Sequence, residues 1–211
     1  MAAKPKPRMP RTQLLAIVAA AAFAVAGTAT GLYLIESSND DLIAQRTAGM
    51  ASIGGPFSLT DEDGKRVTEA DLLGKPTAMF FGFTFCPDVC PMTLFELTNY
   101  IEKLGPDADK LNYVFVSVDW ERDGPEEMAQ YTSAFDERIR GFSGTEAEIA
   151  AITKAYRVFY RRVPTEDGDY TIDHTASVYL MDGDGQLVST IAYDENPEAA
   201  LAKLQRLADA A

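Results

Sequence analysis

The chain has 211 residues, 46% of them hydrophobic, and a formal net charge of −13 at pH 7. This length allows one core of ordinary size, so we expect a single folded domain. From Glu36 onward, 32 acidic residues face 15 basic ones, because four of the 19 basic residues precede it; this part carries −17. Nucleic-acid binding needs clustered lysine and arginine, and this acidity argues against it. The two cysteines lie four positions apart, which indicates local chemistry rather than a disulfide framework.

The N-terminal region predicts a membrane anchor. Residues 1–13 form a basic tail, and residues 14–35 contain 22 residues without a charge. At about 1.5 Å per residue they can cross a hydrocarbon core of roughly 30 Å. Basic residues before the segment and acidic ones after it place the tail in the cytoplasm and the following domain outside. We therefore expect a single-pass protein of the inner (cytoplasmic) membrane, with its C-terminal domain on the periplasmic side.

A cleaved signal peptide is the alternative interpretation of the same region. A short apolar stretch is followed by Ala24-Val25-Ala26, an A-x-A pattern. The apolar character persists to Ile35, which favours a retained anchor or uncleaved signal. Residues 36–54 are small and polar and read as a linker, so the folded domain is expected at residues 55–211.

The folded domain is expected to begin with a hairpin. Short strands at residues 56–60 and 66–68 flank the turn Asp61-Glu62-Asp63-Gly64, and residues 69–73 predict one helical turn.

The two cysteines lie between a predicted buried strand and an amphipathic helix. Residues 77–85 are apolar and aromatic, as in a strand buried on both faces. Pro91 suits the first helical position, so the helix is expected to begin there, with Cys86 and Cys90 in the preceding loop and Gly105 as the C-cap. The positive end of a helix dipole stabilises the thiolate form of cysteines that lie near it. Thiolates bind soft metals or exchange disulfides.

The remaining elements alternate between strand and helix and end in a hairpin and a helix. A capping box at Thr145 and Glu148 opens a helix that is expected to continue through Phe159, with Arg161 and Arg162 in a basic solvated stretch at its end. The other expected elements are a strand at 113–118, a helix at 125–135, strands at 170–172, 176–181 and 186–192, and a helix from Pro197. This order predicts an α/β fold, a thioredoxin-like three-layer sandwich.

His174 is the single histidine of the chain. In a thioredoxin-like sheet its loop faces the dithiol loop, where no proline stands to supply the usual cis-proline. Two thiolates and one imidazole are soft or borderline ligands, which select copper(I) or zinc. Structural zinc would require a fourth protein ligand, and neither a cysteine nor a histidine is left for it, so copper fits better.

Copper(II) could add a weak oxygen ligand to such a set. Asp88 in the loop and Asp119 after the neighbouring strand are the nearest candidates in the sequence, although both could equally be turn or cap residues. Met92 could offer a thioether, but a methionine in a first helical turn is more often part of the core.

Three strings carry a resemblance to a known family. They are FFGFTFCPDVCP, SVDWERDGPE and DYTIDHTASVYLMDGDG, and together with the N-terminal anchor they resemble the Sco/SenC family of membrane-tethered, thioredoxin-like copper proteins. The similarity spans roughly residues 55–208. The string C-P-D-V-C-P combined with a distant D-H-T is specific, whereas C-x3-C alone is weak. Departures from the family pattern are Phe85, Trp120, Gly124 and Gly183.

The resemblance implies that Cys86, Cys90 and His174 bind copper, as copper(I) or copper(II). It also implies delivery of copper to the dinuclear copper site of cytochrome c oxidase, or reduction of the cysteines of that site. The implied partners are the copper-site subunit of that oxidase and other copper carriers or thiol reductants, with the membrane reached through the N-terminal helix. Such a protein is a metallochaperone rather than an enzyme.

Two other functions remain open from the residues alone. A thiol:disulfide oxidoreductase would use Cys86 and Cys90 as a redox pair and would not need His174. A peroxide-reducing enzyme of the same fold is disfavoured, because its cysteine usually lies in a T-x-x-C setting and Thr84-Phe85-Cys86 is one residue shorter.

Overall fold

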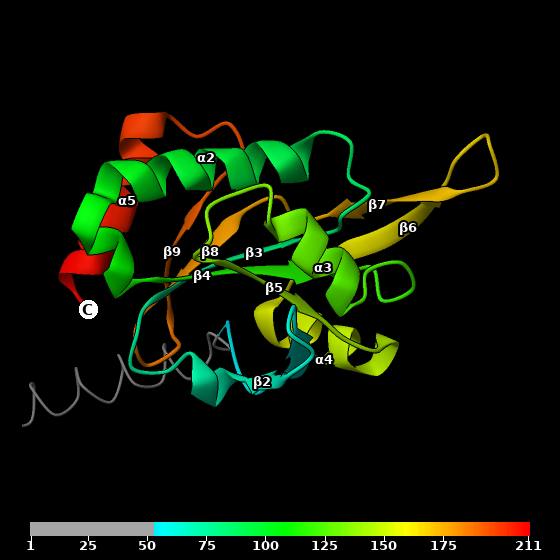
Figure 1. Ribbon diagram of the computed structural model, residues 1–211, viewed down its shortest axis with the longest axis horizontal. Helices are drawn as coiled ribbons and strands as arrows, with labels where there is room; N and C mark the ends of the chain where they lie inside the picture. Colours follow the sequence, from blue (N-terminus) through cyan, green and yellow to red (C-terminus); the bar gives the residue numbers. More distant parts are fainter. Residues whose placement is uncertain (1–52) are drawn as a thin grey trace, which may run out of the picture. The chain divides into compact units, whose positions relative to one another are not determined.

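The computed structural model describes residues 53–211, so the predicted tail, the predicted anchor and most of the predicted linker lie outside the described residues. Among residues 53–211, none of the helices combines the length and the hydropathy needed to cross a bilayer. A seven-stranded sheet organises this part of the chain, in the order β2-β1-β5-β4-β3-β8-β9 (Figure 1). Its strands are β1 (Ser58–Asp61), β2 (Arg66–Thr68), β3 (Thr77–Gly82), β4 (Asn112–Ser117), β5 (Ile139–Ser143), β8 (Val178–Met181) and β9 (Leu187–Ile191).

The centre of the sheet is parallel and its flanks are antiparallel. β3 pairs with β4 and β4 with β5 in parallel register, so these three strands end at one edge. β8 runs antiparallel to β3, and β1 antiparallel to β5. All six residues of β3 are buried, as expected for a strand covered on both faces.

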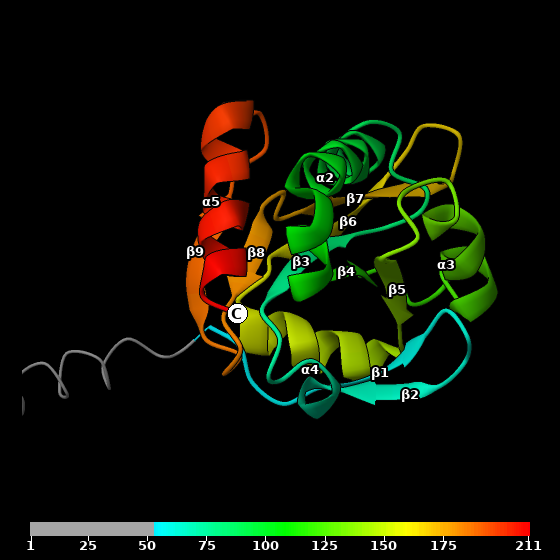
Figure 2. The same cartoon turned by 60° about the vertical axis from the view of Figure 1, so that its left-hand side comes forward.

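Helices cover both faces of this sheet. Figures 1 and 2 show α2, α3 and α5 on one side and α4 on the other, which gives three layers. Their bounds are α2 (Val89–Leu104), α3 (Pro125–Thr132), α4 (Glu146–Tyr156) and α5 (Pro197–Asp209), with short 3-10 helices η1 (Glu69–Asp71) and η2 (Gly105–Lys110). The predicted α/β, thioredoxin-like fold is confirmed for the described residues.

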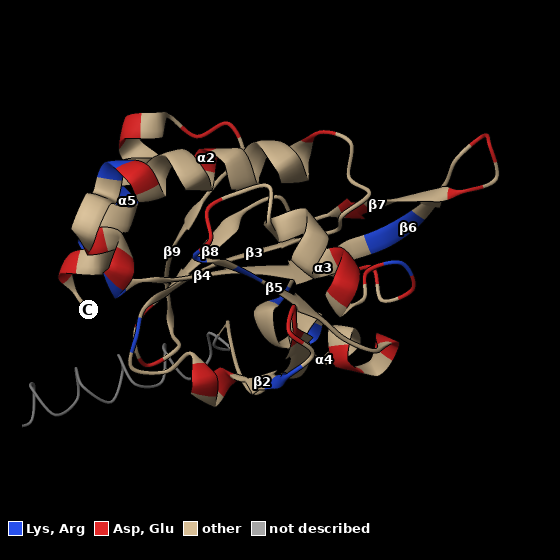
Figure 3. Cartoon of the chain, viewed as in Figure 1, with Lys and Arg blue, Asp and Glu red and all other residues tan. Residues whose placement is uncertain are grey.

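A separate hairpin projects from the sheet edge at which β3 and β4 end. It consists of β6 (Tyr160–Pro164) and β7 (Tyr170–His174), which pair antiparallel (Figure 1). Acidic residues occupy its turn, whereas arginines lie on β6 (Figure 3). The last residue of β7 is His174, so this hairpin carries the only histidine toward the core sheet.

The hairpin corrects part of the sequence-based expectation. The helix α4 ends at Tyr156 because Arg157 adopts a left-handed conformation with φ of 54°. Phe159 therefore lies outside the helix with its side chain exposed. Arg161 and Arg162 lie on β6, not on the expected basic stretch at the end of a helix.

A second missed element is β5, whose sequence IRGFS contains both arginine and glycine and lacks a clear strand pattern. A Cβ at Gly141 would lie 3.1 Å from two side-chain atoms of Met128, so glycine lets α3 pack closely on this strand. Phe142 is fully buried between the layers. Tertiary packing rather than local propensity makes this segment a strand.

The boundaries at the dithiol also differ from the expectation. β3 ends at Gly82 rather than Phe85, and α2 begins at Val89 rather than Pro91. Proline is tolerated at Pro91 because the first N–H groups of a helix have no intrahelical partner. Cys90 therefore lies in the first helical turn, and only Cys86 lies in the loop. Gly105, with φ of 56°, ends α2 as predicted.

Candidate metal centre

Three elements bring Cys86, Cys90 and His174 together. Cys86 lies in the loop after β3, Cys90 in the first turn of α2 and His174 at the end of β7. Their ligand atoms all lie within 4.8 Å of one another, and Cys90 Sγ is 3.4 Å from His174 Nε2. Two ligands of one ion, each about 2.0–2.3 Å from it, lie at most about 4.6 Å apart. The Cys90–His174 separation lies within this limit, and with all three ligand atoms inside 4.8 Å the group is a candidate site for a single soft ion.

The imidazole of His174 is held in the orientation that a metal ligand needs. Its Nδ1 lies 3.0 Å from the carbonyl oxygen of Thr175, which can only accept a hydrogen bond, so Nδ1 carries the hydrogen. Nε2 is thereby the ring nitrogen directed at the sulfurs, and its lone pair is the one that a metal ion would take. The rings of Phe80 and Phe83 pack edge-on against the imidazole, with centroids 6.0 and 5.8 Å away. Buried aromatic side chains of the core thus fix the ligand.

The two cysteines are free thiols with different environments. Cys90 is fully buried, whereas Cys86 is half-buried, and the backbone N–H of Cys90 donates to Cys86 Sγ at 3.4 Å. A hydrogen bond from the Cys90 thiol lowers the pKa of Cys86 to about 4, against the opposing effect of burial, with smaller contributions from His174 and backbone N–H groups. The same hydrogen bond, together with burial, raises the pKa of Cys90. The copper-free pair therefore carries one thiolate, at Cys86.

Gly82 at the end of β3 gives the buried sulfur its space. A Cβ at this position would lie 2.6 Å from Cys90 Sγ and 2.8 Å from Cε2 of Phe115. Both distances are shorter than a van der Waals contact, so any side chain here would displace the sulfur or the ring. The absence of a side chain at residue 82 is therefore a requirement of the site.

The candidate oxygen ligands do not join this cluster. Asp88 is the N-cap residue of α2, and its carboxylate is not one of the grouped ligand atoms. Asp119 is fully buried, and its two oxygens accept hydrogen bonds from Arg122 Nε at 2.5 Å and from the Tyr170 hydroxyl at 2.8 Å. Met92 is 45% exposed, so the expectation that it belongs to the core is wrong.

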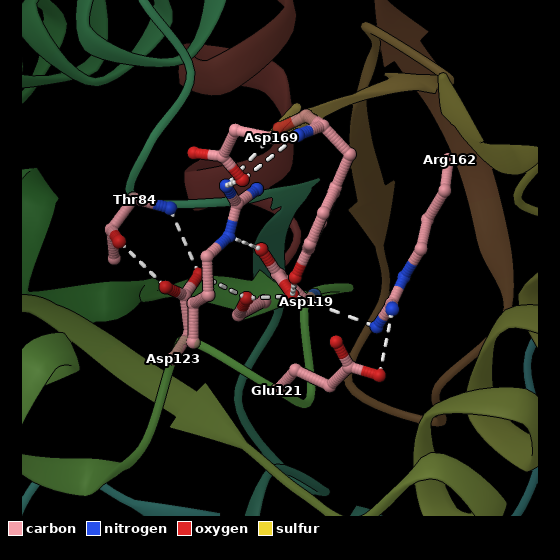
Figure 4. Close-up of polar contacts among 9 residues, drawn as sticks. Thr84, Asp119, Glu121, Asp123, Arg162 and Asp169 are labelled. Atoms are coloured by element: carbon pink, nitrogen blue, oxygen red, sulfur yellow. Dashed lines mark hydrogen bonds and ion pairs between the residues drawn. The ribbon is translucent and has the colours of Figure 1, made fainter. Parts of the chain in front are cut away.

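Sequence reasoning missed the polar network that holds the dithiol loop. The carboxylate of Asp123 accepts hydrogen bonds from the hydroxyl and the backbone N–H of Thr84, at 2.6 and 2.9 Å, and from the hydroxyl of Ser117 at 2.5 Å (Figure 4). Burial raises the pKa of this carboxyl group. The signal available in the sequence was the run SVDWERD, where three carboxylates follow a central strand within six residues.

A thioredoxin-like domain in which a dithiol and an imidazole converge belongs to the class of thiol-based domains that can bind a soft metal ion. The SCO1/SenC family model matches residues 45–209 of this chain. By this match, which covers most of the chain, the protein belongs to the SCO1/SenC family.

Individual relatives agree with this membership. SCO1 homolog 1 of Arabidopsis thaliana, a mitochondrial protein, is 44% identical over 151 residues, which are 70% of this chain and 45% of the relative. Copper-bound ScoI of Bradyrhizobium japonicum is 54% identical, with a TM-score of 0.69, over 74% of this chain and 99% of that structure. Copper-bound Sco1 of yeast is 34% identical, with a TM-score of 0.70, over 76% and 90%. The chain spans about half the length of the curated relatives it matches.

The lowered pKa of Cys86 predicts selective alkylation of the reduced, copper-free protein. Because Cys86 is a thiolate at any pH above about 4, iodoacetamide should modify it at a nearly constant rate from about pH 8 to about pH 5. Fragment-ion mass spectrometry should find the label on Cys86 and almost none on buried Cys90. A rate that falls about tenfold per pH unit below pH 8 would indicate an ordinary thiol and contradict this assignment.

Replacement of Gly82 is expected to damage the site more than the fold. In Gly82→Ala the new methyl group displaces Cys90 Sγ, so copper(I) affinity, measured by competition with a chromophoric chelator, should fall about tenfold or more. Gly183→Ala is the matched control, since its Cβ would have no neighbour closer than 3.6 Å. Equal affinities for the two variants would show that the close approach at residue 82 is unimportant.

Proposed function

We propose that this protein is a copper-binding metallochaperone that delivers copper to the dinuclear copper site of cytochrome c oxidase, or prepares that site. The convergence of Cys86, Cys90 and His174 is the observation that carries the proposal. Copper-bound structures of the related ScoI and Sco1 proteins support it. The role in oxidase assembly follows from the resemblance to the family, and copper is here the cargo rather than a resident cofactor.

The donor set suits copper better than the common alternatives. Copper(I) accepts two thiolates and an imidazole in trigonal coordination, and soft sulfur ligands disfavour hard cations. A structural zinc site would require a fourth protein ligand, and the grouped side chains of the described residues supply three. Copper binding therefore requires only that the Cys90 thiol lose its proton and that His174 offer Nε2.

Unequal exposure of the two sulfurs suggests a direction for transfer. Cys86 is half-buried, whereas Cys90 is fully buried behind it. A partner thiolate can reach the ion on the Cys86 side, displace that sulfur and then take the ion from Cys90 and His174. Cys90 recovers its proton as the ion leaves, which returns the pair to its one-thiolate state.

The cellular arrangement is proposed from the sequence. A basic tail at residues 1–13 and an anchor at residues 14–35 would place the copper-binding domain on the periplasmic side of the cytoplasmic membrane. The linker at residues 36–54 would give that domain the reach to approach a membrane-bound oxidase subunit.

A thiol:disulfide oxidoreductase is the second candidate, favoured by the lowered pKa of Cys86 beside a neighbouring thiol. The Cys86 thiolate would attack a partner disulfide and release one partner thiolate. Cys90 would then resolve the mixed disulfide and release the second, so that two electrons pass from the dithiol to the partner. This reaction has no role for His174.

The need for His174 separates the copper carrier from the thiol:disulfide oxidoreductase. The reduced full-length chain should bind one copper(I) per molecule, and His174→Ala should abolish this binding under competition with a copper(I) chelator. Thr171→Ala, on the same strand β7, is the control and should bind like the wild type. Copper binding that survives in His174→Ala while both thiols are intact would contradict the carrier. A wild type without copper-free disulfide-reductase activity would contradict the oxidoreductase, and in that case His174→Ala would have no such activity to retain.

A further inference from the structure

A cation–π stack joins the two segments that carry the metal ligands. The guanidinium carbon of Arg122 lies 3.7 Å from the ring centroid of Tyr170 and 4.6 Å from that of Phe85. Phe85 directly precedes Cys86, and Tyr170 begins β7, which ends at His174. One side chain therefore contacts both the dithiol loop and the strand that presents the imidazole.

Hydrogen bonds fix the guanidinium between these segments. Its Nε donates to Asp119 Oδ2 at 2.5 Å, and its Nη1 donates to the carbonyl oxygen of Tyr170 at 3.1 Å. The other oxygen of Asp119 accepts the Tyr170 hydroxyl hydrogen bond at 2.8 Å, so carboxylate, guanidinium and phenol form a closed set (Figure 4). The Arg122 side chain is only 16% exposed. Its position is thus determined by the loop after β4 and by β7.

Phe85 contacts the Arg122 guanidinium from outside the core. Its side chain is 59% exposed, so burial is not what holds the ring in place. A planar guanidinium stacks on an aromatic face, whereas a lysine ammonium at the same position lacks that plane. The Phe85–Arg122 contact therefore ties the residue next to Cys86 to β7.

The other ligand pair does not depend on this contact. Cys90 is placed by the first turn of α2 and by Gly82, and His174 packs against Phe80 and Phe83. Loss of the stack would leave Cys90 and His174 together and would free mainly Cys86.

We propose that Arg122 is a positioning residue for copper. By stacking on Phe85 and Tyr170 it fixes the Cys86 loop relative to β7 and so sets the distance between the Cys86 sulfur and the His174 imidazole. This role rests on the copper binding proposed above. Copper(II) is the more sensitive probe, because it prefers tetragonal nitrogen and oxygen coordination and depends on the imidazole, whereas copper(I) is held by both thiolates.

Variants of the full-length chain test the stack from both sides. Arg122→Lys keeps the positive charge but loses the planar group, Phe85→Leu removes the aromatic ring, and Phe85→Tyr keeps an aromatic ring. Arg161→Ala is the matched control. This arginine lies on β6, in the hairpin that also carries Tyr170, but its ion pair with Asp173 is at the surface. Copper(II) affinity is measured by chelator competition, and the copper environment by electron paramagnetic resonance and the thiolate-to-copper absorption band.

Phe85→Leu should weaken copper(II) binding about tenfold, the size expected for one cation–π contact, and Arg122→Lys, which also loses the Tyr170 contact, should weaken it at least as much. Because Arg122→Lys already removes the contact with Phe85, the double variant should lose no more affinity than Arg122→Lys alone. Phe85→Tyr and Arg161→Ala should keep the wild-type affinity and spectrum. Unchanged affinity and spectrum in Arg122→Lys and Phe85→Leu, or additive losses in the double variant, would overturn the proposal.

A measurement without metal separates this proposal from the proposed function. His174 is the only histidine, so the nitrogen-15 resonances of its ring in the reduced, copper-free protein can be recognised directly. Arg122→Lys and Phe85→Leu should shift or broaden them, because the freed Cys86 sulfur no longer keeps a fixed position beside the ring, and Arg161→Ala should not. If the wild type binds no copper, the metallochaperone fails, while these resonances still decide whether Arg122 positions the site. Unchanged resonances in both variants would overturn the positioning role.

Discussion

The approach of one imidazole to two sulfurs is the constraint on which the rest of the structure depends. Two thiolates side by side repel each other, and burial disfavours a charged sulfur further. The copper-free protein avoids both the repulsion and the burial of charge, because the proton stays on buried Cys90 and the thiolate is at half-buried Cys86. His174 completes the set with one imidazole nitrogen. A copper(I) ion would take the place of that proton and, like the proton, would offset one of the two thiolate charges.

The thioredoxin-like fold supplies two of the three candidate ligands, and the hairpin β6–β7 supplies the third. The parallel strand β3 ends beside the N-terminus of α2, where helix N–H groups favour the Cys86 thiolate. The hairpin then brings His174 to the same sheet edge, where the buried rings of Phe80 and Phe83 hold the imidazole. Gly82 leaves room for the Cys90 sulfur between these parts. The site is therefore a property of the core packing and not of one loop.

Much of this arrangement could be predicted from the sequence, because its signals are local. The dithiol, the apolar strand before it and the amphipathic helix after it are contiguous, and the cap at Gly105 and the final helix from Pro197 were predicted correctly. β5 and β6 were not predicted, since β5 is made a strand by packing against α3 and β6 depends on the left-handed turn at Arg157. The Arg122 stack joins residues far apart in sequence, and no local pattern reports such a contact.

Copper X-ray absorption spectroscopy of the copper(I)-loaded full-length protein tests the central claim most directly, because it identifies the atoms bound to the ion. The account predicts three-coordinate copper with two sulfur ligands and one nitrogen ligand, which Cys86, Cys90 and His174 would provide. A spectrum with two sulfur neighbours and no nitrogen would contradict it, since the imidazole would then be near the sulfurs without holding the metal.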